Sequence, residues 1–226
     1  TMIYLLLAED PSPIRLLPPR DIPLAFAPAE AASLGWPGRD GATVHIVPAA
    51  GRWVGGDILS GVVRTGFSRA HDRIWLYVDL GTNGEIALGG SEFALTCACS
   101  AGPAFEGGGI RCGMRADRGA IDGARIDVGR GELDLSVIGG GRVRGICGSG
   151  LIALTDELFR CGWVDRSGRF TERVPERYRA ADAWRSALRL SPRAEVALWE
   201  RDLSSLVRAK AAVFACEQVF DEDGVR

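Results

Sequence analysis

Hydrophobic residues recur with two different periods along the chain, and each period predicts a different element. Between residues 57 and 67 the apolar side chains follow the spacing of one helix face; they are Ile58, Leu59, Val62, Val63 and Phe67. Three apolar runs follow at residues 74–80, 85–88 and 93–99, joined by short glycine-containing turns. Short turns connect antiparallel neighbours, so we expect a helix followed by an antiparallel meander.

The rest of the chain predicts a similar mixture, so the expected fold class is α/β with a mixed α+β sheet. Prolines stop a helical segment at residues 1–9 and leave residues 11–42 irregular. The pattern predicts helices at 29–34 and 151–161, strands at 43–47, 124–128, 133–138 and 195–199, and an irregular arginine-rich stretch with short strands at 163–194. We expect Asp202 to cap a final helix that ends near residue 220.

The turn after the first strand of the meander permits two structures. Residues 79–85 read Asp-Leu-Gly-Thr-Asn-Gly-Glu, and Asn-Gly is a strong signal for a tight β-hairpin. The same residues fit a phosphate loop, because Gly81 and Gly84 can take positive φ and bring backbone N–H groups to an anion. Thr82 and Asn83 add side-chain donors, and the leading aspartate offers Mg²⁺ an oxygen ligand. The two interpretations are compatible, since a phosphate loop can itself be a hairpin turn.

Two further glycine-rich segments follow. Residues 100–113 hold few of the solvating residues that are typical of linkers, so we expect a loop wrapped closely around other atoms. Residues 145–150, Gly-Ile-Cys-Gly-Ser-Gly, precede the helix expected at 151–161. They either offer backbone N–H groups to an anion or let the helix start pack closely against a strand.

Composition narrows the classes of function. The 226 residues are 46% hydrophobic and 25% charged with a formal net charge of −2, which is ordinary for a soluble globular chain. Lys210 is the only lysine, and no basic excess indicates a nucleic-acid partner. No apolar run approaches the roughly 20 residues that cross a bilayer, so no membrane partner is expected.

Cysteine and histidine spacing disfavours a metal centre. The six cysteines form no C-x-x-C pair, and they are Cys97, Cys99, Cys112, Cys147, Cys161 and Cys216. His45 and His71 lie far from them in the sequence. We therefore expect small buried thiols rather than a zinc site or an iron–sulfur cluster, and a reducing, cytoplasmic location.

Four segments carry a family resemblance. They are residues 54–58 (Val-Gly-Gly-Asp-Ile), 79–85, 100–115 (Ser-Ala-Gly-Pro-Ala-Phe-Glu-Gly-Gly-Gly-Ile-Arg-Cys-Gly-Met-Arg) and 145–151 (Gly-Ile-Cys-Gly-Ser-Gly-Leu). Together they resemble the actin-like ATPase (ASKHA) superfamily, which includes sugar kinases, chaperone ATPase domains and acetate kinase. Within it the chain is most similar to the ATP-dependent reductive activators of corrinoid proteins.

The resemblance implies a ribonuclease H-like fold of two lobes, each built on a five-stranded sheet, with ATP and Mg²⁺ between them. Residues 1–72 would be the end of the first lobe, with a connecting helix at 55–67. Residues 73–226 would be the second lobe, and residues 79–85 resemble the second phosphate motif of the superfamily. The sequence holds neither a first phosphate motif nor a later adenosine motif, and no ferredoxin-like cysteine spacing. We therefore expect an internal fragment that is inactive and binds ATP weakly by itself, with a [2Fe–2S] cluster only in a separate N-terminal domain.

The resemblance also implies roles for individual residues. Asp79 would hold Mg²⁺, and the residues expected at the nucleotide are Gly81, Thr82, Asn83, Gly84, Gly107 and Gly108. Asp57, which lies 22 residues before Asp79, would orient the attacking water, or it would only cap its helix. Arg111 and Arg115 would pair with phosphate, form salt bridges or contact a partner.

The expected partner is the corrinoid protein of a methyltransferase system, whose Co(II) form the activator reduces, and the resemblance implies a homodimer. Two other functions stay open. One is a kinase of small metabolites from the same superfamily, and the other is a non-catalytic module for dimerisation or docking. The arginine-rich residues 166–193 would be a partner surface in the docking case, or a solvated irregular segment.

Overall fold

The computed structural model describes residues 2–15, 22–69, 72–182, 185–190 and 196–222, which form two compact units. The first unit comprises Thr1–Asp79 and Glu85–Ala98, and the second comprises Leu80–Gly84 and Cys99–Arg226. The turn that the sequence predicts to bind phosphate, residues 81–84, therefore belongs to the second unit, whereas Asp79 belongs to the first. Among the described residues, no helix has the length and hydropathy needed to span a membrane.

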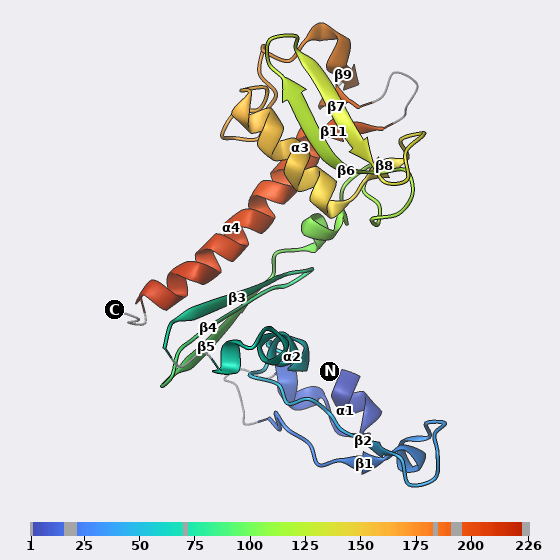
Figure 1. The fold of residues 1–226 in the computed structure, drawn as a ribbon, viewed down its shortest axis with the longest axis vertical. Helices are drawn as coiled ribbons and strands as arrows, with labels where there is room; N and C mark the ends of the chain where they lie inside the picture. The colour runs from blue at the N-terminus through green and yellow to red at the C-terminus, as the bar shows by residue number, and fades with distance from the viewer. Residues whose placement is uncertain (1, 16–21, 70–71, 183–184, 191–195, 223–226) are drawn as a thin grey trace. The chain divides into compact units, whose positions relative to one another are not determined.

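The first unit combines short helices with a two-stranded and a three-stranded sheet (Figure 1). Its elements are α1 (Met2–Leu6), η1 (Ser12–Arg15), β1 (Ala29–Glu30), η2 (Ala31–Leu34), β2 (Thr43–Val44), α2 (Gly56–Thr65), η3 (Phe67–Arg69), β3 (Trp75–Leu80), β4 (Gly84–Gly89) and β5 (Ala94–Cys99). The terminal residues Leu80 of β3, Gly84 of β4 and Cys99 of β5 belong to the second unit. Strands β1 and β2 pair antiparallel, and β3, β4 and β5 are neighbours in chain order, which confirms the meander. The prediction of a helix at 29–34 is wrong at residues 29 and 30, which form β1, whereas residues 31–34 form the short helix η2.

Helix α2 packs its apolar face on the three-stranded sheet. Ile58 and Val62 are buried with Trp75, and Phe67 stacks on the Trp75 ring with centroids 5.8 Å apart. A Cβ on Gly61 would collide with the Tyr77 hydroxyl, so the glycine lets the helix approach β3 closely. The helical period in the sequence therefore gives the correct element and the buried positions Ile58 and Val62, but Val63, expected on the same face, is 64% exposed, and Phe67 lies beyond the helix in η3.

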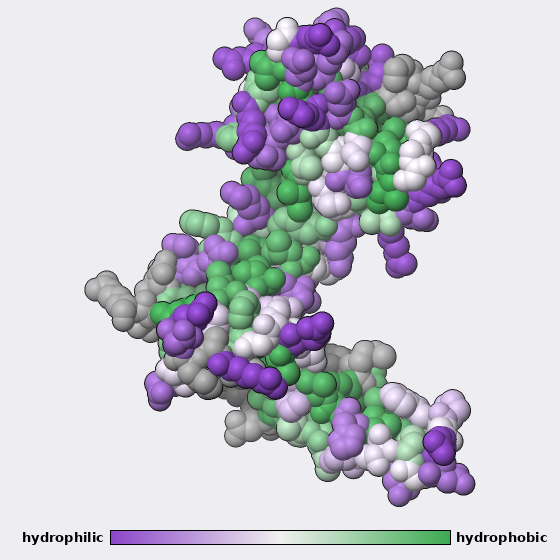
Figure 2. Space-filling view, in the orientation of Figure 1, coloured by the Kyte–Doolittle hydropathy of each residue, from purple (hydrophilic) through white to green (hydrophobic). Residues whose placement is uncertain are grey.

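The second unit holds the larger core. Its elements are η4 (Pro103–Glu106), β6 (Ala120–Asp127), β7 (Glu132–Val137), β8 (Gly145–Ile146), α3 (Gly148–Arg160), η5 (Glu176–Tyr178), β9 (Arg179–Asp182), β10 (Arg185–Arg189), β11 (Ala197–Trp199) and α4 (Glu200–Glu222). Strand β6 pairs antiparallel with β7 and parallel with β8, and β10 lies between β9 and β11. Figure 1 shows α3 beside the β6–β7 hairpin, and Figure 2 shows mainly hydrophilic residues around that region.

Helix α3 is fixed by a row of leucines. Leu151, Leu154 and Leu158 are fully buried, together with Ile121 of β6 and Ile146 of β8. Burying such a row of branched aliphatic side chains is the main favourable contribution to folding here, at roughly 1.5–3 kcal/mol for each side chain. The core therefore holds the start of α3 against the central strand of its sheet.

Several predicted boundaries differ from the structure. Strand β6 starts at Ala120, four residues before the expected start, and α3 starts at Gly148 because tertiary packing admits glycines with low helix propensity. The strand expected at 43–47 ends at Val44. The one expected at 195–199 is seen as β11, with residue 195 outside the described residues. Sheets of five strands are not formed among the described residues, where the sheets have two or three strands.

The expected position of Asp202 as the first cap of the final helix is wrong, although its side chain does accept a hydrogen bond from the residue before the helix. Helix α4 begins two residues earlier, at Glu200. Asp202 is instead a buried carboxylate, 3% exposed, whose Oδ2 accepts the Trp199 N–H and whose Oδ1 accepts the Arg111 N–H, both at 3.1 Å. One side chain thus secures the helix start and also ties it to a loop 91 residues away in the sequence.

Candidate functional site

The hairpin interpretation of the turn after β3 is confirmed. Residues 81–83 join β3 to β4, and the Gly81 N–H donates to the Asn83 carbonyl at 3.0 Å. That N–H is therefore engaged inside the turn rather than directed at a ligand. Thr82 and Asn83 are exposed at the tip, where their side chains are accessible to an anion.

Gly84 is needed for space rather than for its backbone angle. Its φ lies outside the left-handed region, so the expectation of a positive φ is wrong here. A Cβ at this position would lie 2.8 Å from Cys99 Sγ and 3.0 Å from Val213 Cγ2. Both distances are shorter than a relaxed carbon contact, so the glycine allows the strand to pass close to α4.

The turn is tied to the glycine-rich loop that follows the meander. The Thr82 hydroxyl donates to Glu106 Oε2 at 2.6 Å, and the Gly102 N–H donates to the Thr82 carbonyl at 2.8 Å. Glu106 is followed directly by Gly107 and Gly108, two of the expected nucleotide-binding residues. The structure therefore brings two segments that are 24 residues apart in the sequence into one neighbourhood.

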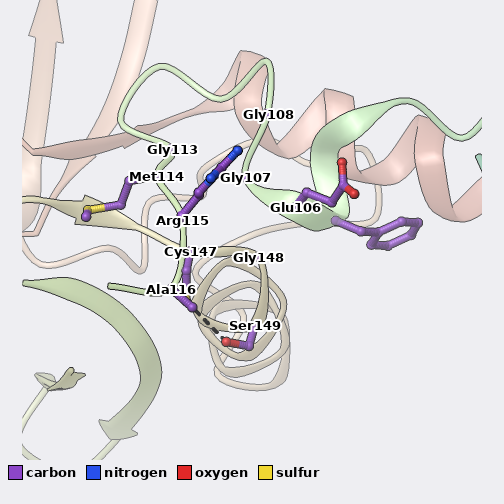
Figure 3. Close-up of a pocket in the computed structure, with 11 residues that line it drawn as sticks. Glu106, Gly107, Gly108, Gly113, Met114, Arg115, Ala116, Cys147, Gly148 and Ser149 are labelled. Atoms are coloured by element: carbon purple, nitrogen blue, oxygen red, sulfur yellow. Dashed lines mark hydrogen bonds between the residues drawn. The ribbon is translucent and has the colours of Figure 1, made fainter. Parts of the chain in front are cut away.

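A cavity of about 670 Å³ opens between this loop and the start of α3 (Figure 3). Residues 105–108, 113–116 and 147–149 line it. Arg115 is exposed, and its side chain extends toward the segment that carries Gly107 and Gly108. The cavity thus combines backbone from two glycine-rich segments with one guanidinium and one carboxylate, that of Glu106.

The glycines at the start of α3 are required for close packing. A Cβ on Gly148 would overlap the Phe105 carbonyl oxygen, and one on Gly150 would overlap the Ile121 carbonyl oxygen. The Cys147 Sγ lies 3.2 Å from the Ser149 Oγ, the contact dashed in Figure 3. The packing interpretation therefore explains Gly148 and Gly150, while Ser149 is exposed at the cavity.

Arg111 has a structural contact. Its guanidinium carbon lies 4.2 Å from the centroid of the Trp199 ring, a cation–π geometry, and its backbone N–H is held by Asp202. Arg111 and Trp199 therefore help to fix the loop on the start of α4.

Glu85 of the first unit lies in the electrostatic field of two other carboxylates. Burial raises the pKa of Glu85, and the negative charges of Asp79 and Asp57 raise it further. Asp57 is exposed in the first turn of α2, whose N-cap is Gly55 and makes no side-chain capping hydrogen bond, so the capping interpretation is wrong. A divalent cation nearby would relieve this repulsion.

The described residues contain no preformed protein cage for a metal. No group of three or more histidine, cysteine, aspartate or glutamate side chains among them is arranged to hold a metal ion. Mg²⁺ commonly keeps several waters and uses one or two carboxylates with substrate phosphates, so a single aspartate such as Asp79 fits it. None of the six cysteines forms a disulfide, and their spacing does not fit an iron–sulfur cluster.

Sequence reasoning missed Glu106 as a site residue. It lies within the segment 100–115 that carries the family resemblance, which is the one signal that could have found it. Its pairing with Thr82 depends on the folded path of the loop and leaves no local pattern. The roles of the expected residues, from Asp57 and Asp79 to Gly107 and Gly108, stay predictions.

Comparison with known proteins gives consistent matches. Residues 73–224 match the family described as the C-terminal domain of RACo, the ASKHA domain, and residues 1–70 match the RACo middle region. The chain is 38% identical over 128 residues to the corrinoid activation enzyme RamQ of Eubacterium limosum, which covers 57% of the chain and 21% of RamQ. It is 30% identical over 145 residues to the Co(II) methylated amine-specific corrinoid protein reductase of Methanosarcina barkeri, which covers 54% of the chain and 26% of the reductase.

A solved structure matches almost the whole chain. The reductive activator for corrinoid, iron-sulfur protein has a TM-score of 0.84 and 39% sequence identity, and the match covers 97% of this chain and 36% of that one. The chain thus spans between 21% and 36% of the length of these relatives. The mixed α/β fold expected from the sequence is confirmed, while the division into a first lobe to residue 72 and a second from residue 73 stays a prediction. The chain belongs to the RACo family, whose C-terminal ASKHA domain it matches over residues 73–224.

Proposed function

We propose that this chain is part of a reductive activator that uses ATP to return an inactive Co(II) corrinoid protein to its Co(I) state. The observation that carries the proposal is the similarity to the solved reductive activator at 39% identity over 97% of the chain. Two curated relatives support it, because their names describe corrinoid activation and reduction of a Co(II) corrinoid protein.

The reaction adds one electron to Co(II), and ATP hydrolysis to ADP and phosphate drives this uphill step. The family resemblance assigns the electron to a [2Fe–2S] cluster in a separate N-terminal domain. The spacing of the six cysteines of this chain does not fit that cluster, so we assign no electron-transfer step to these residues.

The contribution of this chain is to hold the nucleotide. Phosphoryl transfer depends mainly on positioning and on neutralising charge, which backbone donors and Mg²⁺ supply. Asp79 would hold Mg²⁺ directly or through water, and the turn at residues 81–84 would bind the β- and γ-phosphates through Thr82, Asn83 and backbone N–H groups. Gly107 and Gly108 lie beside this turn through the Thr82–Glu106 hydrogen bond, and Asp57 would orient the attacking water.

The partner in this proposal is the corrinoid protein of a methyltransferase system. A homodimer and a cytoplasmic location belong to the same proposal and rest on the family resemblance. The chemistry assigned to the chain needs the second phosphate turn to be intact, which makes Asp79 the most informative residue to change.

The test uses the complete natural protein that carries this sequence. Isothermal titration with ATP and Mg²⁺ and the rate of ATP hydrolysis are compared for the wild type, Asp79→Ala and the control Asp134→Ala, an exposed residue of β7. We expect Asp79→Ala alone to lose at least tenfold in affinity or turnover, because a Mg²⁺ ligand is removed. Unchanged affinity and turnover would remove Asp79 from the site, and phosphorylation of a small metabolite with no effect on a Co(II) corrinoid would favour the kinase alternative.

A further inference from the structure

The hydroxyl of Thr82 is already engaged in this structure. A threonine hydroxyl has one proton to donate, and here that proton is donated to Glu106 Oε2 at 2.6 Å. The proposed function assigns the same hydroxyl to a phosphate oxygen, which also needs a donor. Thr82 cannot serve both acceptors at once, so binding of a phosphate requires an exchange of partners.

The backbone that carries Glu106 is well fixed. Glu106 is the last residue of η4, and the residue that caps this short helix, Gly107, has a left-handed φ of 76°. The Gly107 N–H donates to the Ala104 carbonyl at 3.0 Å, and the Gly108 N–H donates to the Pro103 carbonyl at 2.7 Å. The carboxylate therefore extends from a closed turn of backbone rather than from a free loop.

A second hydrogen bond holds the same two segments together. The Gly102 N–H donates to the Thr82 carbonyl at 2.8 Å, so both the backbone and the side chain of Thr82 are held from the loop. Two ties at one residue limit the motion of the exposed turn at residues 81–83. Such pre-organisation lowers the entropy that a ligand must remove when it binds.

The carboxylate of Glu106 forms no ion pair with a described residue, although the guanidinium of Arg115 lines the same cavity. Among the residues that the structure describes, no basic side chain lies within 4.0 Å of its carboxylate as an ion pair. A bare carboxylate beside a phosphate would repel it, and a divalent cation between the two removes that repulsion. The same carboxylate can therefore position the turn before binding and face the cation afterwards.

We propose that Glu106 is a positioning residue that presets the Thr82 hydroxyl in the nucleotide-free protein, gives it up to a phosphate oxygen, and then faces the Mg²⁺ or one of its bound waters. This inference rests on the proposed function. It adds a residue from outside the second phosphate motif to the nucleotide site.

The binding test separates this role from a purely structural one. ATP affinity is measured by calorimetry in the complete natural protein, once with Mg²⁺ and once with EDTA, for the wild type, Glu106→Gln, Thr82→Ala and the control Glu132→Gln, an exposed residue of β7. In the wild type, Mg²⁺ should increase the affinity for ATP. We expect Glu106→Gln to reduce this increase by about tenfold, a typical effect of losing one charged contact. Its affinity for ATP in the presence of EDTA should equal or exceed that of the wild type. Thr82→Ala should weaken binding in both conditions, and Glu132→Gln in neither.

A nucleotide-free measurement distinguishes failure of this inference from failure of the proposed function. Hydrogen exchange of the Gly102 amide should speed up by about tenfold in Glu106→Ala, which removes the acceptor of the Thr82 hydroxyl, and should change little in Glu106→Gln, which keeps an acceptor oxygen. Equal losses of ATP affinity with Mg²⁺ and with EDTA in Glu106→Gln, or unchanged Gly102 exchange in Glu106→Ala, would overturn the role of Glu106 while the proposed function stands. If the wild type binds no ATP, the proposed function fails, and so does the proposal that Thr82 changes its hydrogen-bond partner. The hydrogen-exchange rate of the Gly102 amide then decides only whether Glu106 holds the turn.

Discussion

Two glycine-rich regions of the second unit differ in what surrounds their residues. In the loop that contains η4 and at the start of α3, glycines sit where a Cβ would meet backbone: Gly113 lies against the Gly107 carbonyl and Gly148 against the Phe105 carbonyl. In the turn at residues 81–83, exposed polar side chains occupy the tip, and two hydrogen bonds at Thr82 tie it to the loop. Glycine content alone therefore does not identify a ligand loop; contacts around each glycine do.

The two regions also differ in how they are anchored. The loop is secured by the buried carboxylate of Asp202 and by Arg111 stacked on Trp199. The turn is secured by the exposed pair of Thr82 and Glu106. A rigid loop that supports a lightly held turn is an arrangement in which a ligand can reorganise the turn without disturbing the core.

The largest expected effect comes from breaking the packing region. Gly148→Ala places a methyl group on the Phe105 carbonyl oxygen, so the start of α3 must move away from the loop. We expect a loss of about 3 kcal/mol in unfolding free energy, measured by urea denaturation. The matched control is Gly129→Ala, where the nearest atom to the new Cβ is 3.4 Å away and φ is not left-handed. Equal stability of the two variants would show that close packing is not what the helix start requires.

A smaller loss of unfolding free energy is expected when the side chain of Asp202, which anchors the loop, is removed. Asp202→Ala leaves the backbone N–H groups of Arg111 and Trp199 without their acceptor, at a cost of about 2 kcal/mol. Asp202→Asn keeps one acceptor oxygen and should lose about half as much. Urea denaturation measures both variants, and an Asp202→Ala protein as stable as the wild type would contradict the anchoring role.

The smallest expected effect is on the pH dependence of stability, and it comes from Glu85 in the first unit. The pKa of Glu85 in the folded chain is raised above its usual value of 4.5, so the folded chain holds this proton at a pH where the unfolded chain has lost it. Stability should therefore fall as the pH rises from about 4.5 through the folded pKa. Glu85→Gln should remove this part of the pH dependence and stabilise the chain at neutral pH.

Thermal unfolding across this pH range, without divalent cations, measures the change. The control is Glu92→Gln, an exposed glutamate in the turn between β4 and β5. If Glu85→Gln left the pH dependence of the wild type unaltered, the repulsion from Asp79 and Asp57 would not affect folding.

Local patterns in the sequence predict the elements of this fold well. The helical period around Ile58 and Val62 gives α2 and its buried face, and Asn83-Gly84 gives the hairpin after β3. The start of α3 is missed because Gly148 has low helix propensity and is helical only through its packing on the loop. Propensity acts locally, whereas packing is decided by residues that are distant in the sequence.

The candidate site is less accessible to prediction for the same reason. The residues of the second phosphate turn are visible as a motif, but the partner of Thr82 is Glu106, 24 residues later. Asp202 looks like a helix cap in the sequence, and its contact with Arg111 spans 91 residues. Neither pairing leaves a periodic or spacing signal, so only the folded chain reveals it.

The most direct test of the account follows the visible spectrum of a Co(II) corrinoid protein mixed with the complete natural protein, a one-electron reductant and Mg²⁺. We predict conversion of the Co(II) spectrum to that of Co(I) only when ATP is added, and a rate at least tenfold lower for Asp79→Ala, in which a Mg²⁺ ligand is removed. A Co(II) spectrum that stays unchanged with ATP, or that changes equally without it, would contradict the proposal that this chain belongs to an ATP-driven activator of corrinoid proteins.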